Sequence, residues 1–253
     1  MSKVLSILLV AGLVLAGCGG KSKPAAAPVT GTITVFAATS LTAAFTDIGK
    51  AFETAHPGAK VTFNFGASSA LVQQVTAGAP LDVFASADTK TIAPLVTAKT
   101  LVPSVVFAHN RLVIVTKPAN PGHIARLTDL PQAGVISLCA AQVPCGSYAA
   151  PALTEAGGAL DESKVTRAAN VAAALTAVSD GDAVAGIVYA TDAKSAGARV
   201  ATVAIPDGDN VIAAYPIART VATTNVGEAR AFVAFVRSAA GQAILTRYGF
   251  ITA

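Results

Sequence analysis

The sequence predicts an α/β fold with two lobes, in which parallel-rich sheets flanked by helices enclose a ligand cleft. First, apolar residues at a period of two repeatedly give way to apolar residues at a period of about 3.6, as strand–helix units require. Second, about 220 residues follow Thr30, enough for two modest lobes with cores of their own. Third, composition changes beyond the extended segments 111–116 and 212–219, so we expect the chain to cross between lobes there.

The first half of the folded region alternates strands with helices. Residues 32–38 alternate apolar and polar side chains and predict a strand, and residues 41–52 then place apolar side chains on one face of a helix. The same pattern recurs, with strands expected at 60–65, 81–86 and 111–116 and helices at 69–77 and 89–98.

The second half opens a further set of such units after a stretch rich in Pro, Asn and Gly. We expect strands at 134–139, 164–167, 185–189, 199–204 and 212–219, and helices at 148–155, 171–179, 226–238 and 239–248. The first lobe should then be discontinuous, with residues 31–111 and 218–253 forming it. The second lobe, residues 112–217, is inserted in its middle.

The N-terminus predicts export. Lys3 is followed by an uncharged, largely apolar run at residues 4–16, too short for a comfortable membrane span, and then by Gly17 and Cys18. The sequence LAGC at 15–18 resembles the bacterial lipobox, which implies a signal peptide at 1–17 and a lipid on Cys18. Residues 18–30 are small, polar and proline-bearing and predict a flexible tether. The alternative is an ordinary cleaved signal with an incidental cysteine. On the lipoprotein interpretation, the protein sits on the outer face of the cytoplasmic membrane.

Composition argues against nucleic acid as a partner. Charged residues make up 13% of the chain and the net charge is +4. No basic run interleaved with aromatic residues appears, so the usual electrostatic footprint is missing. The 3 histidines do not lie at metal-ligand spacings from the cysteines, so we expect no metal held by side chains.

Cys139 and Cys145 form the remaining cysteine pair if Cys18 carries lipid. An exported compartment permits a disulfide, and the short intervening loop can close if its turn brings the two Cα atoms within bridging distance. We expect this disulfide. Two free buried thiols and a metal site are the alternatives.

Several expected helix N-termini carry small polar residues. Ser40 precedes the first helix, Ser68 the second, Cys145 a third and Asn170 with Val171 a fourth. Helix N-termini expose unpaired N–H groups and a partial positive charge, so several in one cleft would bind an anion without lysine or arginine. Taken singly, each of these residues is an ordinary helix cap.

Six segments resemble the successive signatures of periplasmic molybdate-binding proteins, in order over the whole mature domain. They are VFAATSLTAAF (35–45), FGASSAL (65–71), GAPLDVFASAD (78–88), VPCGSY (143–148), GIVYATDA (186–193) and RYGF (247–250). The resemblance implies the two-lobed periplasmic-binding-protein fold of type II. Motifs in register over such a length are far more specific than any one short pattern.

The resemblance also implies a ligand set. In that family two serine hydroxyls, backbone amides and a tyrosine hydroxyl hold the oxyanion. Carried over by motif, these groups belong to Ser40, Ser68, Cys145, Val171 and Tyr189. Cys145 stands where alanine is common, but a backbone donor survives a change of side chain. Thr39 likewise replaces a common alanine.

The implied function is that of an extracytoplasmic substrate-binding lipoprotein that captures molybdate, or tungstate, for an ATP-driven importer. Its partners would be the oxyanion, the permease and ATPase of the importer, and the membrane through a lipid on Cys18. The protein would act as a monomer, with no cofactor and no catalytic residue.

Three alternatives remain open at this point. The protein could bind sulfate or another tetrahedral oxyanion, or it could be a sensing module that signals through a membrane partner. It could also be an exported enzyme using Asp82 and Asp88, although carboxylates at the end of a buried strand more often cap turns or accept from backbone amides. We expect Tyr148 and Tyr215 to be packing residues.

Overall fold

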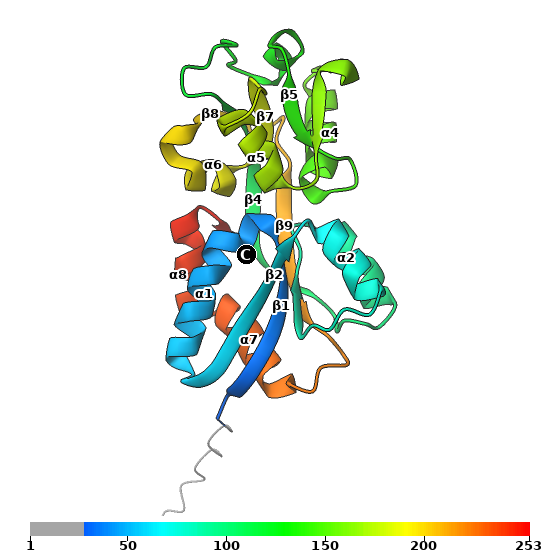
Figure 1. Ribbon diagram of the computed structural model, residues 1–253, viewed down its shortest axis with the longest axis vertical. Coiled ribbons are helices and arrows are strands. Elements are labelled where there is room, and N and C mark those ends of the chain that lie inside the picture. The colour runs from blue at the N-terminus through cyan, green and yellow to red at the C-terminus, as the bar shows by residue number, and fades with distance from the viewer. Residues whose placement is uncertain (1–27) are drawn as a thin grey trace, which may run out of the picture.

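The computed structural model describes residues 28–253, which form two lobes stacked along the longest axis of the molecule (Figure 1). The predicted signal peptide at 1–17, the predicted lipid site at Cys18 and most of the predicted tether at 18–30 lie outside the described residues. Within 28–253, no helix is both long enough and apolar enough to cross a membrane.

The first lobe is built from both ends of the described chain. Its elements are β1 (Thr30–Ala38), the 3-10 turn η1 (Thr39–Leu41), α1 (Thr42–Ala55), β2 (Gly58–Gly66), α2 (Ser68–Thr76), β3 (Val83–Ala85), α3 (Thr89–Thr97), the first part of β4 (Val105–Thr116), β9 (Ile212–Arg219), α7 (Val226–Arg237), α8 (Ala239–Tyr248) and β10 (Ile251–Thr252).

The second lobe is formed by the middle of the chain. Its elements are the end of β4, η2 (Leu127–Gln132), β5 (Ile136–Cys139), α4 (Pro144–Glu155), η3 (Glu162–Lys164), β6 (Val165–Ala168), α5 (Val171–Ser179), β7 (Ala185–Tyr189), α6 (Ala190–Ala196), η4 (Gly197–Arg199) and β8 (Ala201–Ala204).

The sheet of the first lobe runs in the order β2-β1-β3-β9-β4. β1 is parallel to β2 and β3, whereas β9 is antiparallel to β3 and β4. Successive side chains of β1 enter different cores, because a strand directs neighbours to opposite faces. Val35 packs in the core that includes α1 and α7, and Phe36 packs in the core that includes α2 and α3. Both faces of the sheet are therefore covered by helices.

The second sheet places β5 between β6 and β7, with all three parallel, and β7 and β8 pair with the end of β4. The helices α4 and α5 contact β5, and α6 contacts β4. The sheets are mixed, because β4 and β9 run antiparallel to their neighbours. The predicted α/β class with two lobes is confirmed.

β4 runs from the first lobe into the second, beside β9 (Figure 1). Its residues 105–111 pair with β9, and its residues 112–116 pair with β7 and β8. This change of partner coincides with the predicted division at 111/112. Ile212 to Ile217 pair with first-lobe strands, so the ladder favours a return crossing near residue 211 over the predicted 217/218. The assignment of the two lobes by residue remains a prediction.

β4 and α4 begin several residues earlier than the sequence pattern predicts. The strand expected from residue 111 begins at Val105 as β4. The sequence pattern missed its first residues because the polar Asn110, which is buried, interrupts the apolar run. The helix expected from residue 148 begins at Pro144. Proline is favoured in the first turn of a helix, where its missing N–H costs no hydrogen bond.

Candidate functional site

A small cavity lies between the lobes, and all five of the predicted ligand residues line it. Its walls come from η1 and α2 of the first lobe and from α4, α5 and β7 of the second. The lining residues are Ala38, Thr39, Ser40, Gly66, Ala67, Ser68, Ala87, Val143, Pro144, Cys145, Asn170, Val171 and Tyr189. The lobes also contact each other beside the cavity, where α5 meets η1.

The first-lobe wall is set by the ends of three parallel strands. Ala38 at the end of β1 is in register with Gly66 at the end of β2, and Ala37 is in register with Ala85 of β3. Carboxyl ends of parallel strands meet at one sheet edge, which is where α/β proteins bind ligands. Ser40 and Ser68 follow two of these ends directly and therefore reach the same cavity.

The two serines have different environments. Ser68 is 1% exposed, and its Oγ accepts a hydrogen bond from the Ala87 N–H at 3.0 Å. The Ser40 Oγ lies 2.9 Å from the hydroxyl of Tyr215, which is fully buried. Tyr215 does not line the cavity, as expected of a packing residue, but it also has a polar contact that the sequence did not indicate.

The second-lobe wall is made by two helix N-termini. Cys145 lies in the first turn of α4, and Val171 is the first residue of α5. First-turn N–H groups have no acceptor within their own helix, so both ends offer donors to the cavity. Asn170 caps α5 by accepting from the Ala173 N–H at 2.9 Å.

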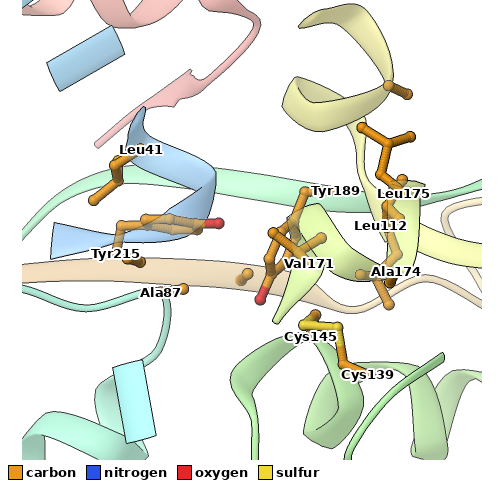
Figure 2. Packing of buried hydrophobic residues seen from close by; sticks show 14 of the residues in the cluster. Leu41, Ala87, Leu112, Cys139, Cys145, Val171, Ala174, Leu175, Tyr189 and Tyr215 are labelled. Carbon is orange, nitrogen blue, oxygen red and sulfur yellow. A yellow bond between two sulfur atoms is a disulfide. The ribbon is translucent and has the colours of Figure 1, made fainter. Parts of the chain in front are cut away.

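The structure joins Cys139 to Cys145 by a disulfide, with the two Cα atoms 5.8 Å apart. Both cysteines are buried, and Figure 2 shows the disulfide beside Val171 and Tyr189. The bridge ties the end of β5 to the first turn of α4. It therefore restrains the turn that carries the Cys145 amide.

Tyr189 offers a buried hydroxyl to the cavity wall. The residue ends β7, is 1% exposed, and has a buried hydroxyl without a hydrogen-bond partner. Buried hydroxyls in proteins are nearly always paired, so this one is free to donate to a group in the cavity. Burial raises the pKa of Tyr189 well above its ordinary value, and the phenol stays protonated as a donor.

Thr39 is a residue of the cavity that the predicted ligand set leaves out. Its Oγ1 is also buried without a partner, and the residue lines the same cavity. The only signal in the sequence was its departure from the alanine common at this position. A threonine here adds a further hydroxyl to the wall.

Neither charged groups nor a metal cluster contribute to this cavity. No lining residue carries a charge. Among the residues that the structure describes, no group of histidine, cysteine, aspartate or glutamate could hold a metal ion. The attraction for an anion therefore comes from hydroxyls, amides and helix N-termini.

Asp82 and Asp88 act as structural acceptors, as their positions predict. The Asp82 carboxylate accepts from the Thr34 N–H at 2.7 Å and from the Thr223 hydroxyl. Asp88 caps α3 by accepting from the Thr91 N–H at 2.7 Å. Both residues are committed to the first lobe, and neither lines the cavity.

We expect the buried carboxyl group of Asp192 to make stability depend on pH. Asp192 lies in the first turn of α6, and its Oδ2 is buried without a partner. Burial raises its pKa to about 7, whereas hydrogen bonds from its own N–H and from Thr191 act to lower it. Because the pKa is higher in the folded state, the neutral carboxyl group contributes to the free energy of unfolding. This contribution is fully present below about pH 4 and is lost as pH rises to about 7.

Asp192→Asn should remove this loss, because the amide has a similar shape and does not titrate. Urea unfolding at about pH 5 and about pH 8 measures the effect, and the wild type should lose more stability between them than the variant. Equal losses in the two proteins would show that the carboxyl group titrates normally.

Comparison with known proteins places this chain among extracellular binding proteins. The family described as bacterial extracellular solute-binding protein matches residues 33–251. The molybdate-binding protein ModA of Mycobacterium tuberculosis is 40% identical over 251 residues, covering 98% of this chain and 95% of that relative.

Two solved structures share the fold. The periplasmic molybdate-binding protein of Azotobacter vinelandii aligns with a TM-score of 0.76 and 22% identity, over 87% of this chain and 99% of that one. The sulfate-binding protein SubI of Mycobacterium tuberculosis aligns with a TM-score of 0.79 and 21% identity, over 87% of this chain and 86% of that one. At such identities the likeness concerns the fold alone, so it does not separate one oxyanion from the other.

Proposed function

The chain belongs to the molybdate-binding proteins within the bacterial extracellular solute-binding family, and we propose that its cavity captures molybdate for an ATP-driven importer. The members it resembles are solute-binding proteins and not enzymes. The buried, unpaired hydroxyl of Tyr189 carries the proposal, because it lines the same cavity as Ser40, Ser68 and two helix N-termini. We assign the oxyanion to the hydroxyls of Ser40, Ser68 and Tyr189 and to the amides of Cys145 and Val171.

The chemistry of the cavity supports a fully deprotonated tetrahedral dianion. Molybdate is an acceptor at every oxygen, and the polar groups of the wall can be donors. Monohydrogen phosphate would bring an O–H group that faces other donors. An unpaired buried polar group costs about 1–3 kcal/mol, enough to weaken phosphate by roughly tenfold to a hundredfold.

Tungstate and the lipid anchor belong to the same proposal. Tungstate has the charge and shape of molybdate, so the same donors would hold it. The LAGC sequence supports a lipid on Cys18, which would tether the protein on the outer face of the cytoplasmic membrane, where we expect it to act as a monomer. Closure of the lobes on the anion would give the form that the permease recognises.

Sulfate is the main rival ligand, because it is also a dianion without a proton and differs from molybdate mainly in size. An enzymatic role has little support, because Asp82 and Asp88 hold first-lobe backbone groups and lie outside the cavity wall. A sensing role would use the same binding site and differ only in the membrane partner.

Calorimetric titration of the purified protein with molybdate, tungstate, sulfate and phosphate tests the proposal. We expect one site that binds molybdate and tungstate, much weaker sulfate binding, and phosphate weaker than molybdate by at least about tenfold. Sulfate binding as tight as molybdate would refute the specificity, and absence of any oxyanion binding would refute the function.

A further inference from the structure

We propose that Tyr215 and Asn110 are positioning residues that make the Ser40 hydroxyl a donor to the bound oxyanion. This inference rests on the proposed function and adds a source of its specificity. Neither residue lines the cavity, and both are fully buried behind it. Asn110 lies on β4 and Tyr215 on β9, the strands that join the lobes.

The orientation of the Asn110 amide is fixed by its neighbours. Its Oδ1 accepts from the Arg111 N–H at 3.0 Å. Its Nδ2 lies 2.9 Å from the Thr191 Oγ1 and 3.4 Å from the Tyr215 hydroxyl. A side-chain amide nitrogen can only donate, so the Tyr215 oxygen accepts from it.

The direction of the next hydrogen bond follows from this one. With Asn110 donating to it, the Tyr215 hydroxyl has its own proton left to give, and the Ser40 Oγ at 2.9 Å is the acceptor. In the reverse direction, the Tyr215 proton would face the donor of Asn110 and stay unpaired in a buried position. Burial also raises the pKa of Tyr215, which keeps the phenol protonated.

Ser40 is therefore held as an acceptor toward the protein. Its only proton is left for the cavity that it lines. Ser68 reaches the same state by another route, because the Ala87 N–H can only donate to its Oγ. Two serines from different elements thus each have a proton to donate to the same cavity, and one of the two lone pairs of each Oγ is already occupied by a protein donor.

The consequence is a cavity wall biased toward donating hydrogen bonds, which disfavours protonated oxyanions. Removing the Tyr215 hydroxyl would free both lone pairs of the Ser40 Oγ and let the hydroxyl rotate, so Ser40 would accept more readily from a ligand O–H. Tyr215→Phe should then weaken molybdate severalfold and weaken phosphate less. The ratio of phosphate to molybdate dissociation constants should fall severalfold, because Ser40 can now turn a lone pair to the phosphate O–H without losing a bond from Tyr215.

Calorimetric titration of wild type, Tyr215→Phe and Tyr248→Phe with molybdate and inorganic phosphate tests this inference. Tyr248→Phe is the matched control, because its hydroxyl donates to Asp47 at 2.7 Å and lies outside the cavity wall. The control should keep the wild-type ratio within about twofold. A wild-type protein that does not bind molybdate would refute the proposed function. A wild type that binds, with an unchanged ratio in Tyr215→Phe, overturns the positioning role alone.

A double-mutant cycle separates positioning from a general loss of structure. In the Ser40→Ala background the Tyr215 hydroxyl has no serine to direct, so Tyr215→Phe should change the molybdate dissociation constant by less than about twofold. An undiminished effect in that background would contradict the inference.

If Tyr215→Phe does not fold, Asn110→Ala provides a second test. It removes the donor to Tyr215, one hydrogen bond earlier in the same series, and should also lower the ratio of phosphate to molybdate dissociation constants.

Discussion

Ser68→Ala is expected to weaken molybdate binding by about 10- to 100-fold. The serine is 1% exposed and lies at the start of α2 in the cavity wall. A hydrogen bond to a charged group contributes about 1.5–3 kcal/mol, and the substitution also leaves the Ala87 N–H without its acceptor. The loss should therefore exceed that of a single neutral hydrogen bond.

Titration calorimetry at constant pH measures this loss, and Ser69→Ala is the matched control. Ser69 is the next residue of α2 and does not line the cavity, so its alanine variant should bind molybdate as the wild type does. Equal affinities for Ser68→Ala and wild type would remove this serine from the ligand set. A folded Ser68→Ala protein, judged by its thermal transition, is required for the comparison.

Gly146→Ala is expected to destabilise the protein by about 3 kcal/mol, because the added methyl group has no room. A Cβ at this position would lie 2.2 Å from the Ala140 carbonyl oxygen and 2.7 Å from that of Cys139. Both are backbone atoms, held by β5, the disulfide and the first turn of α4, so they cannot move aside independently. The clash outweighs the gain of about 1 kcal/mol that alanine brings to a helix.

Gly227→Ala provides the opposite case in another first helical turn. A Cβ at Gly227 meets no atom within 4 Å, so alanine should stabilise α7 by about 0.5–1 kcal/mol. Urea unfolding of both variants gives the two free energies directly. If Gly146→Ala has the same urea midpoint of unfolding as the wild type, the expected clash of its Cβ with the backbone at the end of β5 is contradicted.

Much of the fold follows from patterns that lie within single segments. The strand at 32–38 and the helix pattern at 41–52 each repeat an apolar period over enough residues to be recognised, and both appear as β1 and α1. The early start of β4 was missed because Asn110 looks like a break in an apolar strand. Its side chain is satisfied by Thr191, a partner far away in the sequence.

The candidate site could likewise be predicted only in part from the sequence. Helix N-termini with small polar residues predict an anion site, but only the family resemblance selects Ser40, Ser68 and Tyr189 from many similar residues. The structure brings these residues to one cavity, and their role as ligands remains a proposal. The contact of Tyr215 with Ser40 joins β9 to η1 and leaves no trace in either segment, so no pattern could predict it.

Because β3 pairs with β9, the sheet of the first lobe can be completed only after β9 has been synthesised. Val83 to Ala85 are fully buried and need β9 as their second neighbour, yet the entire second lobe is synthesised before β9 exists. Until then β3 is an open apolar edge, the kind of edge that pairs with other chains. The first-lobe sheet is therefore expected to stay incomplete until residues 212–219 have been synthesised. Folding is completed only after β9 has been released beside β3.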